Sequence, residues 1–123
     1  MKVLTVKQPW AWAILHAGKD IENRGWVTHY RGPLAIHAGA AYVRHSEMPR
    51  GVREPEEADL VFSAILGVVD LVDVVENSRS KWFGGDAYGW VLKNPRPLAK
   101  PLPCKGRLGL WPVPAEFVRK LKG

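Results

Sequence analysis

The alternation of apolar and polar side chains along the chain predicts a fold made mostly of short strands. Alternating or β-branched runs, which are typical of strands, occupy residues 2–6, 33–37, 64–75, 87–93 and 108–113. The run at 64–75 is the longest, and only Gly67 interrupts it. A strand of that length bends as it follows a barrel, so we expect the bend at Gly67.

Short helices are expected between these strands, at residues 10–17, 55–60 and 114–121. Pro9 suits the opening position of the first helix, and Gly18 is its natural stop. Residues 21–26 are expected to be extended, and residues 39–52 to form a loop with one helical turn. A proline-rich basic connection joins the last two strands. This order of elements predicts an α+β fold, a small mixed β-barrel with short flanking helices.

Length and composition are those of one small domain, expected to span residues 1–123. Of these residues 46% are apolar, enough for a buried core without a disulfide or a metal. Cys104 is the only cysteine. No apolar run approaches the roughly 18 residues of a membrane span, and the N-terminus is charged too soon for a signal peptide. We therefore expect a cytoplasmic protein that does not enter a membrane.

The net charge of +6 is distributed unevenly along the chain. Residues 1–78 carry 8 basic and 10 acidic side chains, whereas residues 79–123 carry 10 basic and 2 acidic ones. A basic segment in so small a chain favours a polyanionic partner, because phosphate contacts dominate the affinity of proteins for nucleic acids. The expected ligand is a nucleic acid or a nucleotide; solubility alone is the other explanation of this charge.

Several stretches of the sequence together resemble the ASCH (activating signal cointegrator homology) domain family. They are Leu4–Ala11, Gly18–Arg24, Tyr30–Ala38, Gly67–Asp73, Tyr88–Leu92 and Lys105–Trp111. The resemblance runs through nearly the whole chain and implies a PUA-like barrel, related to domains that bind RNA or recognise modified bases. Fold alone does not decide which of these a chain does.

Three charged residues near the N-terminus form a candidate site. If residues 21–24 are extended, Glu22 and Arg24 project to the same face, because side chains alternate along a strand. Lys19 then lies at the same opening, where the first helix ends. This set suits an anionic or hydrogen-bonding ligand; the alternative is a structural ion pair between Glu22 and Arg24 or Arg31. The resemblance favours a ligand, because this segment lines the cleft in the family.

The six tryptophans divide into two groups. Trp12, Trp90 and Trp111 lie in apolar elements and are expected in the core. Trp10, Trp26 and Trp82 lie beside polar motif residues and are candidates for stacking on bases.

No metal or other cofactor is expected. The histidines His16, His29, His37 and His45 lack the close pairing or companion cysteines of a zinc site. His37 ends a buried strand and is expected to be a hydrogen-bonded core residue, although the resemblance implies that its strand faces the cleft. No glycine-rich phosphate loop is present, and Gly84–Gly85 is expected to be a turn.

Binding without chemistry is the favoured function, with RNA, another single-stranded nucleic acid or a modified nucleoside as the partner. Cations would contact phosphates, Glu22 a base edge, and tryptophans the base faces. The candidate binding residues are Lys7, Gln8, Trp10, Lys19, Glu22, Arg24, Trp26, Arg31, His37 and Lys105.

Two enzymatic alternatives stay open. Some ASCH-like proteins are amidohydrolases that remove the acetyl group of N4-acetylcytidine with a lysine, a threonine three residues later and a strand acid. By resemblance these positions fall on Lys19, Glu22 and Asp70, so the threonine is missing here. We expect Asp70, and not Asp73, to be nearest the cleft. A metal-independent ribonuclease using Lys19, Glu22 and His37 is the second alternative.

Overall fold

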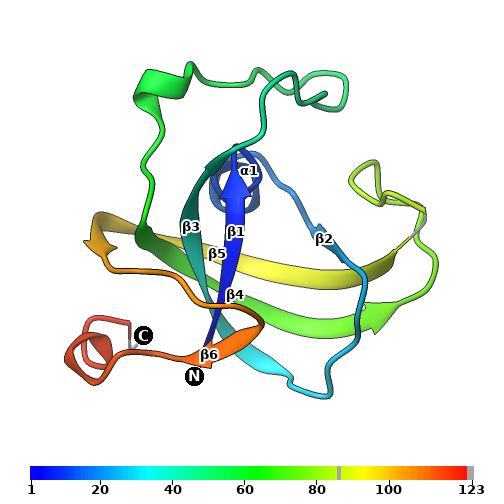
Figure 1. The fold of residues 1–123 in the computed structure, drawn as a ribbon. Helices are drawn as coiled ribbons and strands as arrows, with labels where there is room; N and C mark the ends of the chain where they lie inside the picture. Colours follow the sequence, from blue (N-terminus) through cyan, green and yellow to red (C-terminus); the bar gives the residue numbers. More distant parts are fainter. Residues whose placement is uncertain (86, 122–123) are drawn as a thin grey trace.

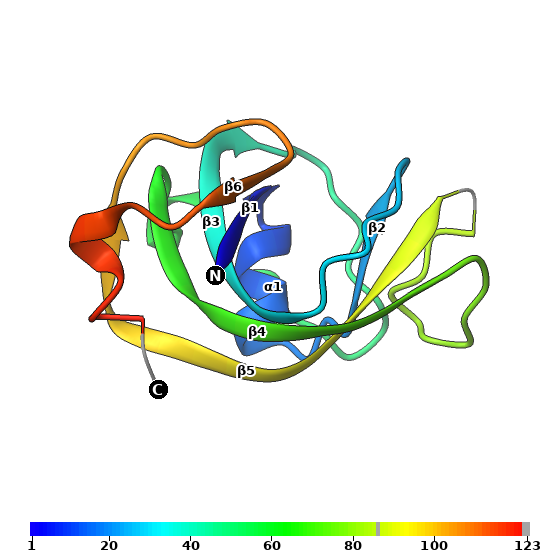
Figure 2. The same cartoon turned by 90° about the horizontal axis from the view of Figure 1, so that it is seen from below.

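The protein forms one curved mixed sheet with a short helix inside its curve (Figures 1 and 2). The structure, a computed structural model, describes residues 1–85 and 87–121. Its elements are β1 (Lys2–Gln8), α1 (Trp10–His16), β2 (Ile21–Arg24), β3 (Gly32–Tyr42), β4 (Ala64–Val75), β5 (Tyr88–Pro103) and β6 (Leu110–Pro112), with 3₁₀ turns at Glu57–Asp59 and Ala115–Phe117. The predicted α+β class is therefore confirmed.

The six strands follow the order β2-β5-β4-β3-β1-β6 in one sheet. β1 pairs with β3 in parallel, and the other neighbours are antiparallel. Within the described residues β2 and β6 form the two ends of this order, and no strand pairing between them is detected. Figure 2 shows how strongly β4 and β5 curve around α1.

The alternation of β1 places its side chains in two different core clusters. Leu4 and Val6 pack with the helix residues Ile14 and Leu15 on the concave side of the sheet, while Val3 packs on the other face, in the cluster that contains Trp111. Burial of its apolar side chains holds the seven-residue helix, which is too short to be stable by itself.

Gly67 marks the bend that the sequence predicts in β4. The register of β4 against β5 shifts between Ile65 and Gly67. A Cβ atom on Gly67 would lie 2.6 Å from the backbone oxygen of Arg96 and 2.9 Å from the side chain of Leu15. Only glycine therefore allows β5 and α1 to approach this point from either side.

Several predicted boundaries are wrong. β5 continues to Pro103, through the segment predicted as a connection. It tolerates its prolines because β2 pairs only with residues 88–91, which leaves the rest of this edge free of partners within the described sheet. β3 extends to Tyr42, into the predicted loop, and the helices predicted at 55–60 and 114–121 are reduced to 3₁₀ turns.

Candidate functional site

The end of α1 and strand β2 bring three charged side chains together. Gly18 has a φ of +74°, which ends the helix and turns the chain toward β2. Glu22 and Arg24 lie two residues apart on β2, so they share a face of the strand. Lys19, Glu22 and Arg24 are called the buried ion network below.

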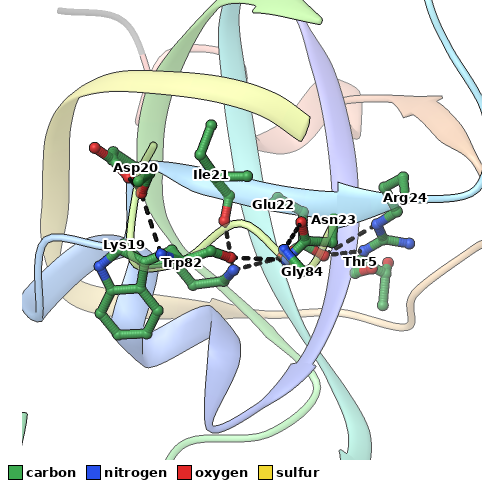
Figure 3. A network of polar contacts seen from close by, with 10 residues as sticks. Thr5, Lys19, Asp20, Ile21, Glu22, Asn23, Arg24, Trp82 and Gly84 are labelled. Atoms are coloured by element: carbon green, nitrogen blue, oxygen red, sulfur yellow. Dashed lines mark hydrogen bonds and ion pairs between the residues drawn. The ribbon is translucent and has the colours of Figure 1, made fainter. Parts of the chain in front are cut away.

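Hydrogen bonds and ion pairs connect this network to the backbone (Figure 3). Arg24 Nε donates to Glu22 Oε2 at 3.0 Å, and Arg24 Nη2 donates to the backbone oxygen of Thr5 at 2.9 Å. Lys19 Nζ lies 3.5 Å from Glu22 Oε1 and donates to the backbone oxygen of Ile21 at 2.5 Å. The Glu22 carboxylate thus lies between two cations, and both of these are also bound to main-chain oxygens.

The burial of Lys19 and Glu22 determines how strongly the charge of each side chain depends on its neighbours. Lys19 and Glu22 are 5% and 7% exposed. Burial lowers the pKa of the Lys19 amine, and the neighbouring Glu22 carboxylate opposes that effect by favouring the charged form. The rings of Trp10 and Trp82 each have their centroid 5.6 Å from Lys19 Nζ, so two aromatic faces add to the stabilisation of its charge.

Two adjoining clefts open onto this network. The large cleft, of about 700 Å³, is lined by Lys7, Arg24, Trp26, Arg107 and Leu108 among others. The small cleft, of about 410 Å³, is lined by Lys19, Lys81, Trp82 and Phe83 among others. Trp10, Glu22 and Asn23 line both. Volumes of this size are typical of sites that hold a small ligand.

The exposed cations of the large cleft come from distant parts of the chain. Lys7 lies near the end of β1 and Arg107 in the connection between β5 and β6. Neither pairs with a carboxylate among residues 1–85 and 87–121. These two side chains are called the cationic rim.

Trp26 is the accessible aromatic side chain of the large cleft. It is 38% exposed, and its ring meets that of Trp90 edge to face at 4.7 Å. Trp90 Nε1 also donates to the backbone oxygen of Trp26 at 3.1 Å.

The other tryptophans are less accessible. Trp90 and Trp111 are buried, as expected for core residues, and Trp12 is half-buried. Trp82 is buried as well, over Lys19.

Four candidate binding residues lie outside both clefts: Gln8, Arg31, Lys105 and His37, the last of which is described below. The buried Gln8 side chain donates to the backbone oxygen of Val61 at 2.8 Å and accepts from the backbone nitrogen of Trp12 at 2.9 Å, so it fixes the start of α1. Arg31 donates to backbone oxygens of its own turn. Lys105 is exposed in the connection between β5 and β6.

His37 is buried behind the large cleft. Its Nε2 lies 2.7 Å from the backbone oxygen of Cys104, and its Nδ1 lies 3.3 Å from Thr5 Oγ1. Because the carbonyl only accepts, Nε2 carries a proton and donates it to this hydrogen bond. His37 therefore attaches the segment before β6 to the sheet, and it does not line either cleft.

The structure does not bring Asp70 to Lys19 and Glu22. The Asp70 carboxylate accepts from Arg96 Nη2 at 3.0 Å, and that hydrogen bond holds the pKa of Asp70 below its ordinary value. Asp70 lines neither cleft. Asp73 lies 3.9 Å from Arg31 and is exposed.

Asn23 is a positioning residue that the sequence did not reveal. Its Nδ2 donates to the backbone oxygen of Trp82, and its Oδ1 accepts from the backbone nitrogen of Gly84, both at 2.9 Å. Together these bonds fasten the loop between β4 and β5 to β2 and hold Trp82 over Lys19 (Figure 3). Its partners lie about sixty residues further along the chain, so no local pattern could indicate the contact.

Neither a metal centre nor a membrane-spanning helix is found in the described part of the chain. Residues 1–85 and 87–121 contain no group of three histidine, cysteine, aspartate or glutamate side chains placed to hold a metal ion. Over the same residues no helix has the length and apolar character needed to cross a bilayer.

Together the curved mixed sheet and the cleft beside α1 define an ASCH-type fold, and the sequence agrees. Residues 4–101 match the ASCH domain family, so the chain belongs to that family. It is 28% identical to human activating signal cointegrator 1 and 26% identical to the mouse protein, in each case over 93% of this chain. The chain spans about a fifth (22%) of the length of these relatives.

Solved structures show the same fold. The crystal structure of ASCH from Zymomonas mobilis superimposes with a TM-score of 0.54, covering 97% of this chain and 91% of the other. The crystal structure of a point mutant of that bacterial protein superimposes with a TM-score of 0.59, covering 97% and 94%. Sequence identity is 16% in both comparisons, so the likeness establishes the fold alone.

Proposed function

We propose that this domain binds a strand of RNA in the large cleft and that binding requires no chemical step. The observation that carries the proposal is the combination of Lys7, Arg107 and Trp26 around one opening of about 700 Å³. Unpaired cations bind phosphates, and an accessible tryptophan stacks on a base.

The buried ion network supplies the polar floor of the site. Glu22 lines both clefts, and within residues 1–85 and 87–121 its oxygen Oε1 has only the 3.5 Å contact to Lys19. A carboxylate oxygen in that position accepts hydrogen bonds from the N–H groups of a base or from a ribose hydroxyl. Because Lys19 and Arg24 fix the carboxylate, it is oriented before a ligand arrives.

A salt titration tests the proposal. Affinity for a fluorescent single-stranded RNA should fall with salt concentration, with a log–log slope of about −0.7 for each phosphate contacted. Lys7→Ala and Arg107→Ala should each reduce the slope by about one contact and leave the fold intact. Lys100→Ala is the matched control, since Lys100 is an exposed lysine of β5 that lines neither cleft.

Two results of this titration would contradict the proposal. If wild-type affinity does not depend on salt, or if Lys100→Ala lowers the slope as much as Lys7→Ala does, the large cleft is not the phosphate-binding surface. A DNA strand of the same sequence, measured in parallel, shows whether the domain contacts the ribose 2′-hydroxyl.

A second candidate function, hydrolysis of an amide on a modified nucleoside, rests on Lys19. Its amine lines the small cleft, and burial lowers its pKa, which is the direction that a lysine acting as a general base requires. The base would take a proton from water as the water oxygen adds to the amide carbonyl. The C–N bond would then break, with the same proton returned to N4, so that cytidine and acetate are the products. Asp70 is not part of this arrangement.

Acetate release from N4-acetylcytidine measures this second function. Turnover that Lys19→Met abolishes, with RNA affinity nearly unchanged, would establish an enzyme. Wild-type protein that binds RNA and releases no acetate would leave binding as the function.

A further inference from the structure

Leu108 stands out among the apolar side chains of the described surface. It is 98% exposed, whereas the other exposed large apolar side chains are at most about half exposed. It lies in the segment Lys105–Gly109, called the basic loop below, and it lines the large cleft together with Trp26. Exposure of a leucine side chain to water is unfavourable, so burying it against a partner would stabilise the complex.

The basic loop is held firmly although its tip is exposed. Before it, the backbone nitrogen of Cys104 donates to the oxygen of Ser63, and the oxygen of Cys104 accepts from His37. After it, Leu110 pairs with Leu4 of β1. The tip is thus attached to the sheet on both sides.

Gly106 fixes the height of the loop above the sheet. A Cβ atom at this position would lie 2.8 Å from His37 Cε1 and 2.9 Å from Thr5 Oγ1, so the backbone rests directly on these two side chains. Gly109 has a φ of +66°, which turns the chain into β6. Leu108 is therefore presented from a preorganised loop, and little conformational entropy is lost when a ligand covers it.

The charges around Leu108 indicate what covers it. Arg107 directly precedes Leu108 and Lys105 lies three residues before it, and both are exposed. Arg107 lines the same cleft as Leu108, together with Lys7 and Arg24. The partner must offer anionic groups to these cations and an apolar face to the leucine. A nucleic-acid strand has both, because its phosphates alternate with stacked base faces.

We propose that Leu108 is a wedge that inserts between two neighbouring bases of the RNA strand bound in the large cleft, with Lys105 and Arg107 on the flanking phosphates. Apolar side chains, leucine included, insert at base steps and separate the bases in other nucleic-acid complexes. This inference rests on the proposed function and narrows it. The ligand is a stacked strand of at least two nucleotides, and a free nucleoside would leave Leu108 uncovered.

The test uses a single-stranded, adenosine-rich RNA with 2-aminopurine in its centre, since the fluorescence of this base is quenched by stacking. Saturation with wild-type protein should raise the fluorescence as the wedge separates the bases. Leu108→Ala should lose this rise and bind roughly tenfold more weakly, with the slope of affinity against salt unchanged. Leu108→Met, which keeps an apolar side chain of similar length, should restore the rise.

The matched control is Val72→Ala, because Val72 is an exposed apolar residue of β4 that lines neither cleft. Leu108→Ala removes no buried contact, so its thermal stability should equal that of the wild type. Salt-dependent binding with the same fluorescence rise in Leu108→Ala overturns the wedge and leaves the proposed function standing, with a protein surface as the remaining partner of Leu108. Wild-type protein that does not bind the RNA at all overturns both.

Discussion

The two adjoining clefts are lined by two sets of charged side chains that differ in burial and in partners. Lys19, Glu22 and Arg24 are bound to one another and to main-chain oxygens, and among the described residues no buried side-chain nitrogen or oxygen lacks a partner. Lys7 and Arg107, by contrast, are exposed and have no acidic partner there. Under the proposed function, the buried ion network gives the site its shape and the cationic rim contacts the phosphates of the ligand.

The same difference sets the energetic consequences of mutation. Removal of one member of a buried ion set leaves charge uncompensated in a poorly solvated place, which costs several kcal/mol. An exposed cation is solvated by water in the free protein, so its removal changes stability little and affects binding instead. Stability and RNA affinity should therefore respond to different residues of the two adjoining clefts.

The largest expected effect is that of Glu22→Gln. The substitution keeps the shape of the side chain but leaves the buried Lys19 and the half-buried Arg24 without their carboxylate. We expect the free energy of unfolding to fall by about 3 kcal/mol. Urea denaturation followed by tryptophan fluorescence measures this.

Asp70→Asn is the control for that experiment. Asp70 also pairs with an arginine at 3.0 Å, but both side chains of this pair are about one third exposed. Its loss should cost at most about 1 kcal/mol. Equal losses for Glu22→Gln and Asp70→Asn would show that burial does not distinguish the two pairs and would remove the basis of the comparison.

Local sequence patterns were enough to predict that the three residues of the buried ion network lie together. The glycine stop after α1 and the alternation along β2 are properties of neighbouring residues, so the grouping of Lys19, Glu22 and Arg24 could be expected before the structure. The bend of β4 at Gly67 could be predicted for the same reason.

Contacts between distant segments could not be predicted in this way. The two hydrogen bonds of Asn23, the contribution of Arg107 to the cleft and the pairing of Asp70 with Arg96 all depend on how the strands are ordered in the sheet. The prolines of β5 led to the prediction of a connection where the strand continues. A strand accepts prolines there only because that edge has no hydrogen-bonded partner strand within the described sheet.

Lys19 gives the smallest and most specific test of the comparison, through the pH dependence of stability. Its pKa is lowered from the ordinary lysine value of 10.5, mainly by burial. Between the lowered pKa and 10.5 the unfolded chain binds a proton that the folded protein has released, so the free energy of unfolding rises with pH in that window. Below the lowered pKa both the folded and the unfolded chain carry the proton, and the folded protein bears the cost of a buried charge.

The variant for comparison is Lys19→Met, which has a side chain of similar length without an amine. Subtracting its stability from that of the wild type largely cancels the titration of the other groups. From neutral pH to 10.5, wild-type stability measured by urea denaturation should therefore improve relative to Lys19→Met. A decline of the wild type relative to Lys19→Met would mean that attraction to Glu22 outweighs burial and that the amine stays charged.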